Sequence, residues 1–531
     1  MKRIILTFLA ITSLYPMFAQ LTSTNLPIAI VTFSGTPSDT AQIQGNLKII
    51  DNVSGVNTPT DAPKFDGMIG VRLRGNTTYP KKSYSIETWS ATSVSLDTSL
   101  LGMPSENDWV LLSSYEDRSL ARFMLSTKTV QKMGRYAPRM KYCELIVNSQ
   151  YQGIYLLGEK IKRDSNRVDI SKLTNIDVSG NNLTGGYILN VDGGSNGWTS
   201  PYAPPFGTTQ TIKVQIEYPD PSDILPVQEN YIEAYVDSFE NAMNAANFQD
   251  TTLGWRRFGG VNSMADYMII TEVCKDLDAY RKNAYFYKDK GNKLRFGPIW
   301  GHDVAWKNSA DCNAAKDTGW AFNHGAVCAT NTRLAPFWWS KVVTDTAYMR
   351  ELKCAYSLYR MPGGALDTTT LFSVLDSVNT YLNAQSAVSR NFTQWPIWGV
   401  PIVNEPTPMA STYSEELANM KAFIKARLAW LDTKWYMSTG CPLPASVQNI
   451  MVSQNVRVYP NPASSELTVT IQTASRKACT IRVVNMQGAT MFQTNSTTNT
   501  STLNISNLAP GLYFVHIYDG EQMVSKKFVK Q

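Results

Sequence analysis

The feature that most constrains the fold is a change of sequence pattern near residue 450. Residues 441–455 contain no charged side chain and carry two prolines near their start, which is typical of a linker. Beyond them, short runs of strand-forming residues recur at intervals of roughly 8–12 positions, a spacing typical of β-sandwiches. We therefore predict a small all-β, Ig-like sandwich over 456–531, preceded by a separate and larger body over 20–440.

The body over 20–440 combines strand and helix patterns, which predicts an α+β fold. Its first part is rich in short apolar runs and contains one amphipathic helix, over Arg118–Met133, whereas helical spacing dominates beyond residue 225. We expect a strand-rich lobe followed by a larger, mostly helical lobe. The expected strands are Leu26–Phe33, Gly70–Arg74, Ser83–Thr88, Trp109–Ser113, Glu144–Val147, Gly153–Leu157, Asn283–Tyr287 and Leu294–Trp300, and the later helices are Glu229–Ala246, Ser263–Lys275 and the regions near 335–360, 367–383 and 413–436.

The N-terminus has the composition of a secretory signal peptide. Lys2 and Arg3 precede an apolar run, and Ala19 offers a small residue for cleavage. A membrane anchor is the alternative, but it needs about 20 apolar residues, more than this run supplies. We predict a signal peptide over 1–19, no later membrane-spanning segment, and a protein that works outside the cytoplasm.

Seven cysteines in an exported chain leave at least one thiol unpaired. Spacing alone does not fix the pairing. Cys312–Cys328, which flanks a loop rich in small and polar residues, is the first expected disulfide, and Cys354–Cys441 is the second. Cys143 and Cys274 lie in strongly apolar stretches, which predicts buried free thiols.

The formal charge of +6 does not extend to the body of the chain. The signal peptide carries +2 and the segment 456–531 carries +4, so residues 20–455 are neutral overall. A neutral body without a repeated pattern of basic and aromatic residues argues against nucleic acid as a partner. A phosphorylated ligand would therefore have to be held by a local site.

Two acidic residues and an asparagine form the strongest chemical pattern in the body. Asp278 precedes Asn283 by five positions, and Asp303 follows the next pair of expected strands. Oxygen ligands of this kind suit Mg²⁺ together with phosphate groups. Each of these residues could equally serve as a turn or capping residue. With only three histidines in the chain, a histidine-rich metal site has little support.

Several motifs surround this pattern in a fixed order between residues 65 and 310. They are Arg72-Leu73-Arg74-Gly75-Asn76, Lys81-Lys82-Ser83-Tyr84, Leu101-Gly102-Met103-Pro104, Asn107-Asp108-Trp109-Val110-Leu111, Tyr151-Gln152-Gly153-Ile154-Tyr155-Leu156-Leu157-Gly158-Glu159-Lys160-Ile161, Gly185-Gly186-Tyr187-Ile188-Leu189 and Gly297-Pro298-Ile299-Trp300. The chain here resembles the CotH kinase family, the atypical kinases related to spore coat protein H. The resemblance implies a two-lobed protein-kinase-like fold, with an N-lobe near 20–225 and a C-lobe near 226–440. It also implies ATP and Mg²⁺ as cofactors and phosphoryl transfer to Ser/Thr of exported or surface proteins.

The resemblance implies roles for individual residues. Asp278 would orient or deprotonate the acceptor hydroxyl, and Asn283 would support a metal. Asp303 would bind Mg²⁺. Lys82 or Arg74 would be the cation on the nucleotide phosphates, with Glu159 as an ion-pair partner.

The chain departs from the family at one acidic position. Where the family usually has Trp-Asp-x-Asp, this chain has Trp300-Gly301-His302-Asp303. One of two acidic positions is therefore missing. The alternative to an active kinase is a catalytically inactive, kinase-like surface protein that binds a protein or a glycan, and Mg²⁺-dependent ATP binding distinguishes the two.

The C-terminal segment carries a second set of motifs. They are Val458-Tyr459-Pro460-Asn461-Pro462, Val484-Asn485-Met486-Gln487-Gly488, Leu508-Ala509-Pro510-Gly511-Leu512-Tyr513 and Lys526-Lys527-Phe528-Val529-Lys530. The segment resembles the type IX secretion sorting domain of Bacteroidetes bacteria. This resemblance implies recognition by the type IX machinery and export across the outer membrane, with release or attachment at the cell surface. The alternative is an accessory binding sandwich.

Overall fold

The computed structural model describes residues 21–194, 196–207, 209–328, 333–402, 404–438, 441, 456–471, 479–485, 490–518 and 523–531. The expected signal peptide over 1–19 lies outside these residues, as does the expected linker over 441–455 apart from Cys441. The chain divides into two compact units, Met1–Tyr436 and Met437–Gln531.

The first unit opens with a closed β-barrel. Its strands follow the order β1-β2-β3-β4-β5-β7-β6, and the parallel pairing of β1 with β6 closes the ring. Side chains from several of these strands, among them Val31, Leu47, Val71 and Ile86, fill its apolar core. The strands are β1 (Ile28–Phe33), β2 (Ile43–Ile50), β3 (Phe65–Arg74), β4 (Ser83–Trp89), β5 (Asp108–Leu112), β6 (Met140–Val147) and β7 (Gln150–Glu159).

The sequence pattern predicts all of these barrel strands except β2. In β2, the run Gln44-Gly45-Asn46 interrupts the apolar residues, so only its second half alternates clearly. The strand forms because both neighbours supply backbone partners, with β1 on one edge and β3 on the other. Local propensity is therefore secondary here to pairing with distant strands.

A second sheet joins segments on both sides of residue 225. Its order is β12-β11-β8-β10-β9, so β8 pairs directly with β11, and Val191 lies opposite Ala284. The expected division between lobes at residues 225 and 226 therefore cuts through one sheet. The observed body is a mixed α/β unit with an N-terminal barrel, and its two-lobed, kinase-like character stays a prediction. The strands are β8 (Tyr187–Val191), β9 (Trp198–Thr199), β10 (Lys213–Tyr218), β11 (Ala284–Lys288) and β12 (Arg295–Phe296).

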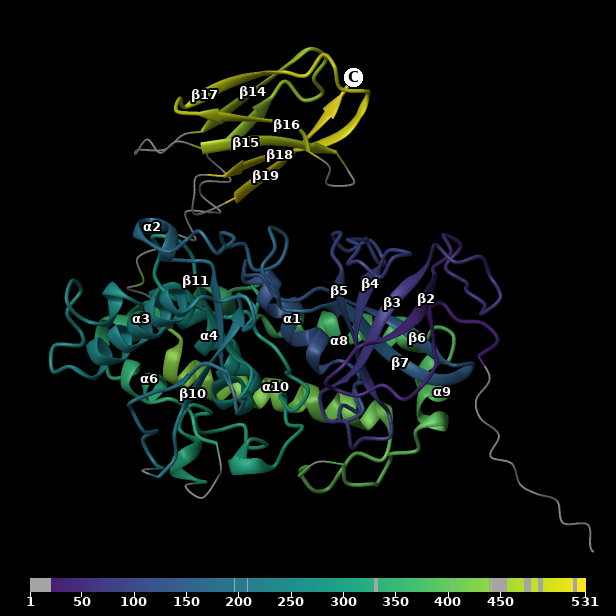
Figure 1. The fold of residues 1–531 in the computed structure, drawn as a ribbon, viewed down its shortest axis with the longest axis horizontal. Helices are drawn as coiled ribbons and strands as arrows, with labels where there is room; N and C mark the ends of the chain where they lie inside the picture. The colour runs from purple at the N-terminus through teal and green to yellow at the C-terminus, as the bar shows by residue number, and fades with distance from the viewer. Residues whose placement is uncertain are drawn as a thin grey trace, which may run out of the picture. The chain divides into compact units, whose positions relative to one another are not determined.

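Helices complete the first unit around a core that extends from Leu26 to Trp435. Figure 1 places the barrel strands toward one end of this unit and α3 and α6 toward the other, with α10 running between them. The long helices agree with the expected ones, whereas the short helices α2, α5 and α9 are not predicted. The helices are α1 (Arg122–Lys132), α2 (Gly180–Leu183), α3 (Pro226–Asn244), α4 (Val261–Cys274), α5 (Asp278–Arg281), α6 (Phe337–Val342), α7 (Thr346–Arg360), α8 (Thr368–Asn383), α9 (Ala387–Gln394) and α10 (Tyr413–Trp435).

The second unit consists of two antiparallel sheets, as the strand spacing predicts. One has the order β13-β14-β17 and the other β16-β15-β18-β19, and residues of both contribute to one apolar core that includes Leu467, Val483 and Val515. No helix in the described part of the chain is long and apolar enough to cross a membrane. The strands are β13 (Val456–Tyr459), β14 (Glu466–Ile471), β15 (Cys479–Asn485), β16 (Thr490–Ser496), β17 (Thr500–Asn504), β18 (Gly511–Tyr518) and β19 (Met523–Lys530).

The cysteines agree with the predicted pattern. Cys312 and Cys328 form a disulfide, and both members of the second expected pair, Cys354 and Cys441, are disulfide-bonded. Cys143 and Cys274 are free and buried, as expected. The disulfides belong to the part of the sequence that follows α5.

Helix α9 is attached to the barrel by a buried lysine. The Lys81 amine donates to the Ile154 carbonyl at 2.7 Å and to the Asn391 side-chain oxygen at 3.0 Å. The same Asn391 oxygen accepts from the Ile154 amide at 3.0 Å. Both acceptors of Lys81 are uncharged, and burial lowers the pKa of this amine to about 7.

We expect the stability contribution of Lys81 to depend on pH. Between pH 7 and 10.5 the unfolded chain retains a proton at Lys81 that the folded chain has released. Raising the pH across this window should therefore increase the free energy of unfolding of the native protein relative to Lys81→Met, by up to about 1.4 kcal/mol per pH unit. Guanidinium unfolding at pH 7 and pH 9 measures this difference.

The neighbouring Lys82→Met is the matched control, because the Lys82 side chain is partly exposed. Its stability difference from the native protein should change little over the same pH range. Equal pH dependence of the two variants would contradict a special role for the buried amine.

Candidate functional site

The turn between β3 and β4 presents one cation to the segment that contains Asp303. Arg74 ends β3 opposite Ser83 of β4, and its guanidinium lies 4.9 Å from the centre of the Trp300 ring. One of its terminal nitrogens, Nη1, is buried without a hydrogen-bond partner among the described residues. Burial lowers the pKa of Arg74 to about 10, which leaves the side chain positively charged at neutral pH.

Lys82, at the other end of this turn, has a different environment. Its amine donates to the Thr77 carbonyl at 2.7 Å and so braces the turn itself. Lys82 and Arg74 are the two alternatives expected for the cation at the nucleotide phosphates. In the structure, Arg74 contacts Trp300, whereas the Lys82 amine is bonded within the turn.

Asp278 lies at the start of α5 and is compensated by positive charge. Its carboxylate pairs with Arg281 at 2.8 Å and with Lys282 at 3.3 Å. Burial raises the pKa of Asp278, but the charges of Arg281 and Lys282 outweigh burial and lower the pKa below its ordinary value. The Asp276 side chain accepts a hydrogen bond from the Asp278 amide at 2.9 Å, which stabilises the turn at the start of α5. Asp278 is therefore an ionised, partly exposed carboxylate.

The side chains of Asn283 and Asp303 both lie close to Gly301. A methyl group placed at Gly301 would come within 2.9 Å of Asn283 Nδ2 and 3.8 Å of Asp303 Oδ1. Gly301 also has a φ of 70°, a conformation that side-chain-bearing residues rarely adopt. The missing acidic residue of the family pattern is thus replaced by a glycine whose Cβ position is crowded by Asn283, and we call this position, together with the Asn283 and Asp303 side chains beside it, the Gly301 space.

The pKa values of Asp303 and Glu116 are both raised above their ordinary values. Burial, and then the nearby charge of Glu116, raise the pKa of Asp303 well above its ordinary value. Burial and the charge of Asp278 likewise raise the pKa of Glu116. Sequence reasoning missed Glu116, although its position in the charged run Glu116-Asp117-Arg118 just before α1 could have marked it as a candidate.

Glu159 belongs to a different cluster from the one expected. Its buried carboxylate accepts from the Arg139 side chain at 2.8 Å and from the Arg139 amide at 2.9 Å, and Tyr136 donates to it at 3.2 Å. Among the described residues, its cationic neighbours are Arg139 and Arg167. The structure thus does not pair Glu159 with Arg74 or Lys82, because Arg139 already neutralises it.

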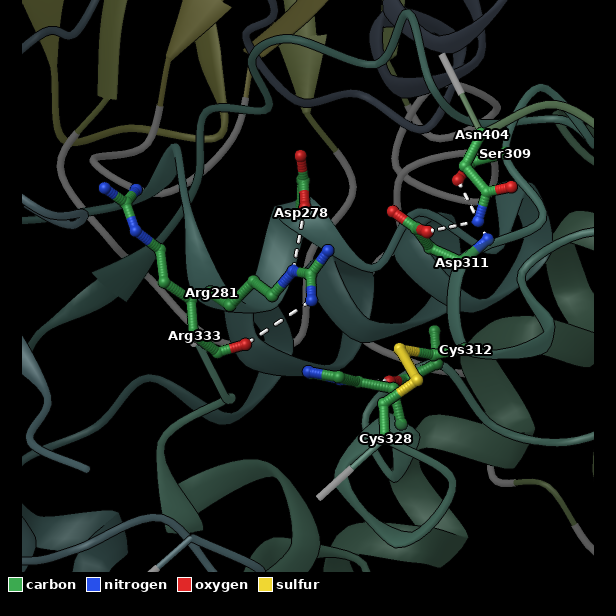
Figure 2. The surroundings of a disulfide bond; sticks show 10 residues. Asp278, Arg281, Ser309, Asp311, Cys312, Cys328, Arg333 and Asn404 are labelled. Atoms are coloured by element: carbon green, nitrogen blue, oxygen red, sulfur yellow. Dashed lines mark hydrogen bonds and ion pairs between the residues drawn. A yellow bond between two sulfur atoms is a disulfide. The ribbon is translucent and has the colours of Figure 1, made fainter. Parts of the chain in front are cut away.

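The disulfide-closed loop that follows Asp303 is fixed to the Asp278 segment. Lys275, just before Asp276, donates to the carbonyls of Asn313, Lys316 and Thr318 at 2.5–2.8 Å. Figure 2 shows Arg281 between Asp278 and the Arg333 carbonyl, near the Cys312–Cys328 bond. The sequence pattern predicts the disulfide but gives no indication of this attachment.

The residues around Gly301 fit a magnesium–phosphate ligand better than a bare metal ion. Within the described ranges, no three His, Cys, Asp or Glu side chains converge closely enough to hold a metal by themselves. Asp303 supplies a carboxylate oxygen, Asn283 supplies a side-chain amide whose nitrogen is its atom nearest Gly301, and Arg74 supplies a guanidinium nitrogen without a partner among the described residues. Mg²⁺ commonly binds through one or two carboxylates together with waters and substrate phosphates. The donor set therefore fits Mg²⁺ that arrives with a nucleotide.

Comparison with known protein families identifies both parts of the chain. Residues 457–531 match the secretion system C-terminal sorting domain, which directs the protein through the type IX system to the cell surface and implies contact with that machinery. No curated protein matches the sequence. Residues 71–431 match the CotH kinase protein model, which extends the resemblance well beyond residue 310. Since this match covers more than half of the chain, the protein belongs to the CotH kinase protein family.

Proposed function

We propose that the protein is a secreted, Mg²⁺-dependent protein kinase that transfers the γ-phosphoryl group of ATP to Ser/Thr of exported or surface proteins. Family membership and the sorting domain support the phosphotransferase class and the location. The observation that carries the proposal is the approach of the Asn283 side-chain amide and the Asp303 carboxylate to Gly301. Gly301 directly follows Trp300, whose ring contacts the Arg74 guanidinium.

Each residue of the site has a distinct proposed role. When bound, Mg²⁺ and ATP would supply charge neutralisation and the transferable phosphoryl group. Asp303 and Asn283 would hold the metal, and Arg74 would contact the phosphates. Lys82 would contribute by holding the turn that positions Arg74.

Asp278 would orient the acceptor hydroxyl. Its pKa is lowered by Arg281 and Lys282 once burial is outweighed, so it is ionised at neutral pH but a weak proton acceptor. Of the two roles expected for this residue, orientation therefore has the better support. In phosphoryl transfer, most of the rate enhancement comes from positioning and charge stabilisation, so a weak base is adequate.

We expect metal and nucleotide to bind together. ATP with Mg²⁺ should raise the melting temperature of the native protein more than the sum of either ligand alone, because the site lacks a third carboxylate. Asp303→Asn should abolish this shift. Asp278→Asn should keep the shift but lower the rate of phosphoryl transfer about 100-fold or more. Differential scanning fluorimetry and transfer of labelled phosphate to a protein acceptor measure the two effects.

The matched control is Asp376→Asn, which removes an exposed carboxylate from α8. It should change neither the nucleotide-induced shift nor the transfer rate. The absence of a shift with any nucleotide in the native protein would reject the kinase proposal and favour the inactive, protein- or glycan-binding alternative.

We also expect the C-terminal unit to be needed for delivery but not for nucleotide binding. Removing residues 456–531 should leave the protein in the periplasm, because the recognised sorting domain is lost. Cell fractionation and surface labelling of the full chain and the shortened chain measure this outcome. Surface delivery of the shortened chain at the native level would contradict it.

A further inference from the structure

The backbone that follows Asp303 contains two consecutive non-glycine residues with positive φ, a conformation that is unfavourable without stabilising contacts. Trp306 and Lys307 have φ values of 53° and 68°, in the left-handed region that residues with large side chains rarely occupy. Two such residues in succession persist only where surrounding contacts hold them. The contacts that hold this segment therefore bear directly on where the Asp303 carboxylate lies.

The side-chain amide of Asn308 links the backbone of Asp303 to the backbone of Glu116. Asn308 Nδ2 donates to the Asp303 carbonyl at 2.7 Å and to the Glu116 carbonyl at 2.8 Å. Asn308 is 4% exposed, so both bonds are shielded from water. The two bonds use both protons of the amide and fix the backbones of Asp303 and Glu116 at a set distance from each other.

Other contacts hold the remainder of the segment from α1 and α4. Arg122 Nε donates to the Ala305 carbonyl at 3.0 Å, and the Trp306 ring nitrogen donates to Ser126 at 2.9 Å. The Trp306 amide donates to the Cys274 carbonyl at 2.8 Å. Within the described part of the chain, Asn308 is the side chain that bonds to the Asp303 backbone itself.

We propose that Asn308 is a positioning residue for the metal ligand Asp303: by bonding the carbonyls of Asp303 and Glu116 together, it holds the Asp303 carboxylate at the Gly301 space. The inference rests on the proposed function, in which Asp303 holds Mg²⁺. Asn308 does not touch the ligand, and it acts only through the backbone. Residues that orient a metal ligand in this way typically change metal affinity 10- to 100-fold when they are removed.

The test compares two buried asparagines in the full-length chain. Asn308→Ala removes two hydrogen bonds beside Asp303, and Asn391→Ala removes two at the contact between α9 and the barrel. Both should lower the melting temperature. With Mn²⁺ as the probe metal and saturating ATP, only Asn308→Ala should raise the half-saturating metal concentration, by about 10- to 100-fold. Mn²⁺ electron paramagnetic resonance and the metal dependence of the melting temperature both report it.

A gentler variant keeps the test informative if Asn308→Ala does not fold. Asn308→Gln retains the amide on a longer side chain and should give a smaller rise in the half-saturating Mn²⁺ concentration. Identical metal curves for the Asn308 variants and Asn391→Ala would overturn the positioning role while leaving the kinase proposal intact. A native protein without any metal-dependent ATP binding would overturn both.

Discussion

The buried guanidinium of Arg122 is the interaction on which the first unit depends. It pairs with Asp117 at 2.6 Å and with Glu416 at 2.5 Å, and it also donates to the Ala305 carbonyl. These partners come from the segment just before α1, from α10 and from the segment after Asp303. Removing one partner of a buried ion pair commonly costs about 3–5 kcal/mol, because the remaining charge is left uncompensated. Three distant parts of the sequence must therefore assemble together.

The acidic residues of the first unit differ in how their charge is compensated. Asp278 pairs with two cations and stays ionised, whereas neither Asp303 nor Glu116 forms an ion pair with another described residue, and burial raises the pKa of both. Uncompensated carboxylates in a protected site are costly unless a cation joins them. In the proposed function, the ionised Asp278 would contact the neutral acceptor hydroxyl, and Asp303 would contact the metal.

Features that depend on local pattern could be predicted from the sequence. The strands of the C-terminal unit and the long helices follow from apolar periodicity, and the Cys312–Cys328 pair follows from its loop. Features that depend on distant pairing could not. The bonding of β8 to β11 joins residues about a hundred positions apart, so the expected boundary at residue 225 falls between strands of one sheet.

The candidate site was predictable to the same extent. Motif order singles out Asn283 and Asp303, whose side chains the structure places close to Gly301. It also singles out Glu159, but a motif does not reveal that Arg139 already neutralises that carboxylate. The role of Asn308 depends on two backbone carbonyls, and backbone contacts leave no residue-type signature in one sequence.

The geometry of Gly301 limits how this site can change. An aspartate there would have to adopt a φ of 70° and displace the Asn283 amide, which lies 2.9 Å from the position of its first side-chain atom. A single substitution would therefore not restore the second acidic position of the family without a rearrangement of the adjoining loop. We therefore expect the arrangement with one carboxylate to persist. Substitutions should accumulate in the residues around Gly301 before Gly301 itself is replaced.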